Sequence, residues 1–209
     1  MGRALIPELR RRGHRVLALV RENSISKLPP NCEPLLGNPL DGKTFATRIP
    51  SGSTFVQLVG VPHPSPRKAK QFREIDLVSV RESVAAASAA GVEHFIYLSV
   101  AQPAPMMRDY LAVRAEGEAM IRAAGLRATI LRPWYVLGPG HRWPYALIPF
   151  YWICERIPAT GDGARRLGLV TLRQMIDALV CAVENPPEQG VRIVEVPEIR
   201  TLESMPSAM

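Results

Sequence analysis

Cysteine, long apolar runs and concentrated charge are all scarce in this sequence of 209 residues. The three cysteines, Cys32, Cys154 and Cys181, lie far apart and without metal-ligand spacing, so neither a disulfide framework nor a metal site is indicated. The longest run of aromatic and apolar residues, 143–154, is too short to span a bilayer. We therefore expect no metal and no membrane span.

Signals for secretion and for nucleic-acid binding are also missing. The amino terminus shows no charged segment followed by the apolar stretch that a secretory signal requires. The net charge is +7, but the basic residues are scattered and no aromatic residues interleave with them. One compact run, Arg10-Arg11-Arg12, precedes Gly13 and is typical of a helix end. These features favour a cytoplasmic protein with no nucleic-acid partner.

The order of apolar patterns predicts an α/β protein. Short apolar runs typical of buried strands occur at 16–20, 54–60, 95–99 and 128–131. Between two of them, from 72 to 91, apolar residues recur at helical spacing, and Gly91 is a fitting stop. Strands separated by helices of this length pair in parallel with right-handed crossovers. The chain length favours a single domain.

One stretch carries a dense cluster of polar groups that could do chemistry. Ser99 ends an apolar run and would therefore lie at the carboxyl end of a buried strand. Tyr110 and Arg114 are four residues apart, so on a helix they share one face. A guanidinium one turn from a phenol can lower the pKa of the phenol and can reach a ribose or a phosphate. His94, before the same strand, is expected to be a surface or strand-edge residue.

These residues carry a family resemblance. Ser99, Tyr110 and Arg114 resemble the Ser…Tyr-x-x-x-Lys site of the short-chain dehydrogenase/reductase superfamily, with arginine in place of the lysine. The segment 132–139 resembles the RPxxVxGP motif of extended and atypical members, and 114–118 resembles the KxxxE continuation of the active-site helix. The likeness covers nearly the whole chain and is nearest to atypical, NmrA-like proteins that bind NAD(P).

The resemblance implies a Rossmann-like fold, a doubly wound parallel sheet with helices on both faces. It would form one NAD(P)-binding domain over 1–200, in which 140–200 shape the substrate side, and 201–209 would be a frayed tail. Gly2 resembles the last glycine of the TGxxGxxG fingerprint, but the first strand and the earlier glycines are absent. We hypothesise that the chain is an amino-terminally truncated form of a longer product. A genuine loss of the phosphate loop is the alternative.

The resemblance also assigns cofactor contacts. Arg21 follows the second strand, where an acidic residue would bind the ribose hydroxyls of NAD and a basic one suits the extra phosphate of NADP. NADP is therefore favoured, with NAD as the alternative because Glu22 is adjacent. Asn38 lies in a turn that usually meets the adenine edge, although a plain turn explains it equally well. The full set of expected cofactor contacts is Gly2, Arg21, Asn38, Leu58, Val59, Gly60, Arg114 and Pro133.

The implied chemistry is NADP-dependent oxidation or reduction of a small carbonyl or hydroxyl substrate. Tyr110 would exchange a proton with the substrate oxygen, and Ser99 would hydrogen-bond to the same oxygen. Arg114 can supply charge, but its high pKa makes it a poor member of a proton relay. Aromatic residues crowd into 141–152, where they could line the substrate pocket, cap the core or form a dimer contact.

Two other functions stay open at this point. The arginine in place of lysine suits a protein that binds the dinucleotide without catalysis, as a sensor or as a subunit that stabilises a complex. The absent glycine loop suits a protein that binds partners and no dinucleotide.

Overall fold

The computed structural model of the protein describes residues 1–104, 106–138 and 167–202. Its strands are β1 Leu17–Val20, β2 Glu33–Leu36, β3 Thr54–Gln57, β4 His94–Leu98, β5 Ala128–Arg132, β6 Tyr135–Leu137, β7 Leu169–Thr171 and β8 Val191–Glu195. Its α-helices are α1 Gly2–Arg11, α2 Ala69–Gln71, α3 Val78–Ala90, α4 Arg108–Ala123, α7 Leu172–Glu184 and α8 Val196–Thr201. Short 3₁₀-helices are η1 Glu22–Lys27, η2 Gly42–Thr44, η3 Ala46–Arg48 and η4 Pro66–Lys68, and η5 Phe72–Leu77 is π-helical.

The central sheet has the order β3-β4-β5-β8, and every pairing in it is parallel. In its register Phe95 lies opposite Ala128, and Leu131 lies opposite Val194. The strands are apolar at consecutive positions because helices cover both faces of a parallel sheet. The predicted parallel α/β sheet is confirmed.

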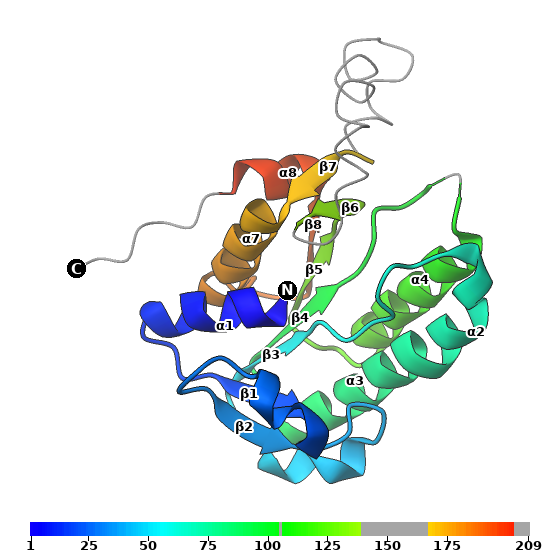
Figure 1. Ribbon diagram of the computed structural model, residues 1–209. Coiled ribbons are helices and arrows are strands. Elements are labelled where there is room, and N and C mark those ends of the chain that lie inside the picture. Colours follow the sequence, from blue (N-terminus) through cyan, green and yellow to red (C-terminus); the bar gives the residue numbers. More distant parts are fainter. Residues whose placement is uncertain (105, 139–166, 203–209) are drawn as a thin grey trace.

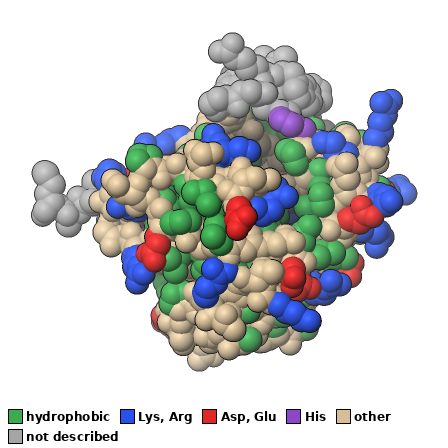
Figure 2. Space-filling model, turned by 60° about the horizontal axis from the view of Figure 1, so that its bottom comes forward, with side chains coloured by type: hydrophobic (Ala, Val, Ile, Leu, Met, Phe, Trp, Pro, Cys, Tyr) green, Lys and Arg blue, Asp and Glu red, His purple; other side chains and the backbone are tan. Residues whose placement is uncertain are grey.

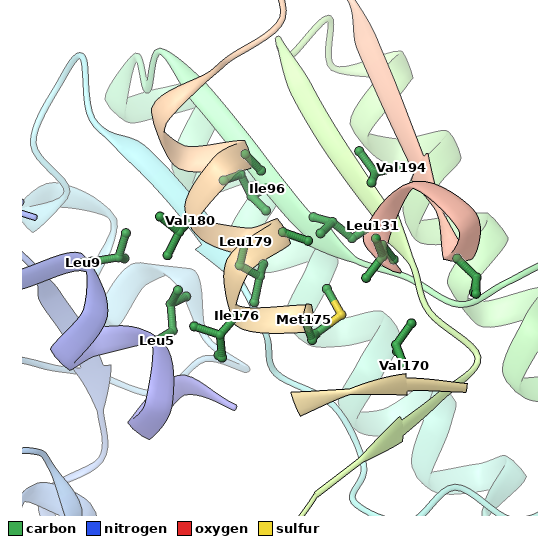
Figure 3. Packing of buried hydrophobic residues seen from close by; sticks show 14 of the residues in the cluster. Leu5, Leu9, Ile96, Leu131, Val170, Met175, Ile176, Leu179, Val180 and Val194 are labelled. Carbon is green, nitrogen blue, oxygen red and sulfur yellow. The ribbon is translucent and has the colours of Figure 1, made fainter. Parts of the chain in front are cut away.

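One face of this sheet is covered by α1, α7 and α8 (Figure 1). Figure 3 shows Leu5 and Leu9 of α1 beside the α7 residues, with Leu179 directed toward Ile96 and Leu131 of the sheet. Ile96, Leu131 and Leu179 are completely buried. At about 25 cal/mol per Å² of buried apolar area, such contacts are the main source of stability.

The other face is covered by α3 and α4 (Figure 1). Val80 of α3 and Ile121 of α4 pack against Phe95 and Ile130 of the sheet. Neighbouring strand residues thus enter opposite clusters, since Ile130 faces α3 and α4 while Leu131 faces α7. Helices on both faces confirm the predicted doubly wound, Rossmann-like architecture.

A smaller parallel sheet, β1-β2, lies beside β3 but is not hydrogen-bonded to it. All four residues of β1 are half-buried, whereas His94 to Tyr97 of β4 are fully buried. Within the described residues, the second edge of β1 and the outer edge of β3 have no strand partner.

Several sequence expectations are refined by the structure. The predicted helix from 72 to 91 forms, but its first six residues are π-helical, and Gly91 ends it with φ +65°. The strand Tyr135–Leu137 and the helix Val196–Thr201 were not predicted. Thr201, assigned to a frayed tail, therefore closes a helix. The aromatic cluster at 141–152 and the rest of the tail, 203–209, lie outside the described residues.

The expectation for His94 was wrong. It is 1% exposed, lies inside β4, and its Nε2 is 2.9 Å from Thr129 Oγ1 on β5. Burial, with a smaller contribution from Arg127, lowers its pKa to about 4. His94 is therefore a neutral core residue.

The charged side chains are scattered over the surface, as the sequence predicts. On the face in Figure 2, Lys and Arg side chains alternate with Asp and Glu and form no single basic patch. No helix within the described ranges is long and apolar enough to cross a membrane.

Candidate functional site

Arg21 and Asn38 lie in one cavity at the carboxyl ends of β1 and β2. The cavity has a volume of about 480 Å³, and its wall includes Glu22, Gly37 and Thr44. Such a position, outside the carboxyl ends of parallel strands, is where open α/β sheets bind ligands. The two residues, seventeen positions apart in sequence, are brought together because β1 and β2 pair in parallel.

The polar groups in this cavity are available to a ligand. Arg21 is exposed and forms no ion pair within the described part of the chain, so its charge is not neutralised by Glu22. Asn38 accepts a hydrogen bond from the Leu40 N–H at 3.1 Å, and its own N–H donates to Thr44 Oγ1 at 2.8 Å. These bonds fix the turn and leave the Asn38 side-chain NH₂ group as a donor.

Ser99 is buried one residue beyond β4 and faces Glu118 of α4. Its Oγ donates to Glu118 Oε1 at 2.7 Å, and Arg132 contacts the same carboxylate twice, at 2.6 and 2.9 Å. Burial raises the pKa of Glu118, but Arg132 and Ser99 outweigh it and hold the pKa below its usual value. An ionised carboxylate only accepts hydrogen bonds, so the Ser99 proton is engaged by Glu118.

Arg114 is also buried, and its guanidinium is held by protein groups. Nη2 contacts Asp76 Oδ1 at 2.5 Å, and Nη1 donates to the Leu98 carbonyl at 2.9 Å and to Tyr97 Oη at 3.4 Å. Burial raises the pKa of Asp76, and Arg114 offsets part of that rise. Burial likewise raises the pKa of Tyr97. Of the three guanidinium nitrogens, Nε has no hydrogen-bond partner among the described residues.

Tyr110 lies beside Arg114, but the contact is through its ring. The Arg114 Cζ atom is 5.1 Å from the ring centroid, which is cation–π geometry. The half-buried ring also packs against Phe72 of η5, with centroids 5.0 Å apart. The helix α4 thus places Tyr110 and Arg114 on one face, as predicted. No contact within the described structure joins Tyr110 to Ser99.

The loop after β3 is tied to the Arg114–Asp76 pair. Asp76 Oδ2 accepts the Val61 N–H at 3.0 Å. A Cβ atom added to Gly60 would lie 2.4 Å from Arg114 Nη2 and 3.1 Å from Asp76 Oδ1. Glycine is therefore required at 60 by the ion pair, whereas the sequence suggested only contact with a cofactor. Leu58 and Val59, in the same loop, line a second cavity together with Gly2.

Pro133 is buried directly after β5, and its carbonyl accepts the Ala101 N–H at 2.9 Å. This bond ties the segment after β4 to the segment after β5. Pro133 supports the Ser99 region through backbone contact, and neither described cavity includes it.

The residues fit a dinucleotide best at its adenosine end. The unpaired cation of Arg21 and the amide of Asn38 are suited to a phosphate and to a polar base or sugar edge. At the other end the fit is weaker, because the Arg114 Nη atoms and the Ser99 proton already have protein partners. No group of His, Cys, Asp and Glu within the described residues has the geometry of a metal site.

Two carboxylates that bind site residues, Asp76 and Glu118, were not predicted as site residues from the sequence. Asp76 was not singled out, although it falls four residues after Phe72, on the buried side of the helix predicted there. A carboxylate on an apolar helical stripe is the signal that could have found it, since such a group needs a buried cation. Glu118 was noted only as part of a motif.

Comparison with known proteins finds a matching family and a related curated protein. A family model described as NAD(P)H-binding matches residues 1–142. Ceramide reductase of Caulobacter vibrioides is 28% identical over 142 residues, which are 67% of this chain and 44% of that protein. The chain therefore spans less than half of the length of this curated relative.

Solved structures share the fold. A short-chain dehydrogenase/reductase superfamily protein from Agrobacterium tumefaciens with bound NAD has a TM-score of 0.66 and 18% identity, covering 91% of this chain and 73% of that one. A UDP-glucuronic acid 4-epimerase from Bacillus cereus in complex with NAD has a TM-score of 0.65 and 18% identity, covering 93% and 73%. At these identities the likeness concerns the α/β fold alone.

Proposed function

The chain belongs to the NAD(P)H-binding family, and from this premise we propose that it is an NADP-dependent oxidoreductase acting on a small carbonyl or hydroxyl substrate. The observation that carries the cofactor choice is Arg21, which has no ion-pair partner among the described residues and lines the same cavity as Asn38 at the ends of β1 and β2. A guanidinium there matches the extra phosphate of NADP. The free thiols Cys32 and Cys181 suit the cytoplasm, where we place the reaction.

Each side chain of the site has a separate role. A nicotinamide held in the site would supply or accept the hydride. Tyr110 holds or releases the proton at the substrate oxygen. Arg114 keeps the Tyr110 ring in place through its cation–π contact and fixes the loop after β3 through Asp76. Ser99 fixes the end of β4, because its hydroxyl donates a hydrogen bond to Glu118 Oε1.

The cofactor choice is tested by reversing the charge of Arg21. We expect Arg21→Glu to weaken NADPH binding roughly 10- to 100-fold, the value of a lost charge-assisted contact, and to change NADH binding much less. Titration calorimetry with both cofactors measures this. The matched control is Arg73→Glu, which makes the same charge change at an exposed position on η5. Equal losses for NADPH and NADH would remove the basis for NADP.

A second candidate is a dinucleotide-binding protein without catalysis. It is favoured by the engagement of the Ser99 proton by Glu118 and by the replacement of lysine with an arginine whose Nη atoms bind protein groups. Turnover of NADPH with a panel of small aldehydes and ketones separates the two. The oxidoreductase predicts turnover that Tyr110→Phe abolishes while NADPH affinity stays within about twofold. NADPH binding with no turnover across the panel would establish the second candidate.

A further inference from the structure

A second arginine, Arg48 of η3, is held against the wall of the cavity that contains Arg21. Its side chain is exposed, and its Nη2 atom donates to the carbonyl oxygens of Leu36 and Thr44. Leu36 and Thr44 both line the cavity at the carboxyl ends of β1 and β2. The guanidinium of Arg48 therefore lies next to this cavity, although Arg48 and Arg21 belong to separate elements.

The path of the chain after β2 explains this placement. A Cβ atom added to Gly37 would lie 2.9 Å from Leu19 Cδ1 and 3.0 Å from Phe45 Cβ. Because Gly37 has no side chain, the completely buried Phe45 packs closely against the end of β2. The 3₁₀-helices η2 and η3 lie directly before and after Phe45. Arg48 follows Thr44 by four residues, so its side chain can return to the Thr44 carbonyl.

Most of the hydrogen-bonding capacity of Arg48 is still available to a ligand. A guanidinium has five N–H donors in a planar fork. Its Nη2 group is used by the two carbonyls, and neither Nε nor Nη1 has a partner among the described residues. No carboxylate within the described ranges pairs with Arg48 either. A guanidinium edge formed by Nε and Nη1 is suited to bidentate contact with a phosphate.

The charges around the cavity show why a second cation matters. The wall itself contains one cation, Arg21, and one anion, Glu22, so its formal charge is zero. The other charged groups of the adjoining turn and of α3 beside it form balanced sets, Asp41 with Lys43 and Glu82 with Arg81. A phosphate monoester carries a charge of about −1.5 to −2 near pH 7. Arg48 is therefore the group that makes these surroundings positive and favourable to such an anion.

We propose that Arg48 is a second specificity-determining residue for the cofactor, and that it binds, together with Arg21, the phosphate on the 2′ position of the adenosine ribose. The inference rests on the cofactor choice of the proposed function and adds a residue from a separate element. Arg48 can bind this phosphate while Nη2 stays on the two carbonyls, so the cation is already in place before the ligand arrives. A dinucleotide without the phosphate gains nothing from Arg48.

The test uses adenosine 2′-monophosphate and adenosine 5′-monophosphate, two isomers of equal charge, titrated into the full chain and followed by NMR. Arg48→Gln keeps an NH₂ donor for the carbonyls but removes the charge. We expect it to lower the preference for the 2′ isomer roughly tenfold, the value of a lost charge-assisted contact. The matched control is Arg73→Gln at an exposed position of η5, which should leave the preference unchanged. Arg48→Lys keeps the charge and should restore part of the preference.

A measurement on the wild type does not depend on whether a variant folds. The Arg48 Nε–H resonance should shift when the 2′ isomer is added and stay in place with the 5′ isomer. The same loss of affinity for both isomers in Arg48→Gln would overturn the proposal, because Arg48 would then only hold the turn. Absence of binding of either isomer to the wild type would overturn it as well.

Failure of this inference can be told apart from failure of the proposed function, because the adenosine phosphates contain no nicotinamide. Binding of the 2′ isomer through both arginines, with no NADPH turnover, would keep Arg48 as a phosphate ligand and exclude the oxidoreductase. NADPH turnover together with a preference for the 2′ isomer that is unchanged in Arg48→Gln would do the reverse.

Discussion

The two halves of this molecule differ in the pairing of their strand edges and in the burial of their side chains. The closed half consists of β4, β5 and β8 with α3, α4 and α7, and its central strands β4 and β5 are buried on both faces. The open half consists of β1, β2 and the cavity between β1 and β3, and its strands are half-buried or exposed. Apolar burial stabilises the closed half, whereas the open half has strand edges with no partner among the described residues and the cavity that contains Arg21.

This difference separates stability from ligand binding. The ionisable groups of the closed half, such as Glu118 and Arg114, are neutralised by protein partners. Arg21 in the open half carries a charge with no partner in the described structure and is therefore suited to a ligand. We expect substitutions in the closed half to change the free energy of unfolding, and substitutions around Arg21 to change affinity.

The largest effect should follow removal of the buried cation. Arg114→Met leaves Asp76 as an unpaired buried carboxylate, so we expect a loss of about 3–5 kcal/mol in the free energy of unfolding. Urea denaturation measures this loss. The control is the double variant Arg114→Met/Asp76→Leu, which should recover most of it because the uncompensated charge is gone. A loss below about 1 kcal/mol in the single variant would contradict a closely paired buried charge.

A matched pair of leucine truncations tests the two halves directly. Leu131→Ala in β5 removes a completely buried side chain and should cost about 2–5 kcal/mol, because it leaves a cavity in the closed half. Leu19→Ala in β1 removes a half-buried side chain that lines the cavity between β1 and β3 and should cost about 1 kcal/mol. Both are measured by urea denaturation. Equal losses would show that β1 is packed as firmly as β5.

Much of the closed half could be predicted from the sequence because its signals are local. The apolar runs that became β4 and β5 and the glycine that ends α3 identify elements without reference to distant residues. The shared helix face of Tyr110 and Arg114 is equally local, since it depends on spacing alone.

The partners of the site residues could not be predicted because they are distant in sequence. Asp76 lies 38 positions before Arg114, and Glu118 lies 19 positions after Ser99. The burial of His94 was missed for a related reason. A polar residue at the start of an apolar run is typical of an exposed strand end. Only the pairing of β4 with β5 places Thr129 beside the His94 ring.

The buried His94 makes the closed half sensitive to acid. The folded pKa is about 4 and the unfolded value is 6.5, so the unfolded state binds the proton first as pH falls. The stabilisation is complete above pH 6.5 and is lost as pH falls toward 4, with a total of about 3 kcal/mol. His94→Gln retains a donor for Thr129 but does not titrate. The stability difference between wild type and this variant should therefore change over this range. A constant difference would mean that the pKa of the ring is the same in the folded protein as in the unfolded chain.

The smallest effect is expected in the open half, at the ion pair between Arg15 and Glu33. Its atoms are 2.9 Å apart, but both side chains are largely exposed, so water screens the attraction. Arg15→Ala should leave the Tm unchanged within error. The matched substitution Arg12→Ala removes a largely buried side chain that joins Glu8 of α1 to Glu184 of α7, and it should lower the Tm by about 2–4 °C. Equal shifts in a thermal melt would mean that exposed pairs stabilise β1 and β2 as strongly as semi-buried pairs stabilise the helices. The open half would then depend on surface charge for its stability as strongly as the helices depend on their semi-buried pairs.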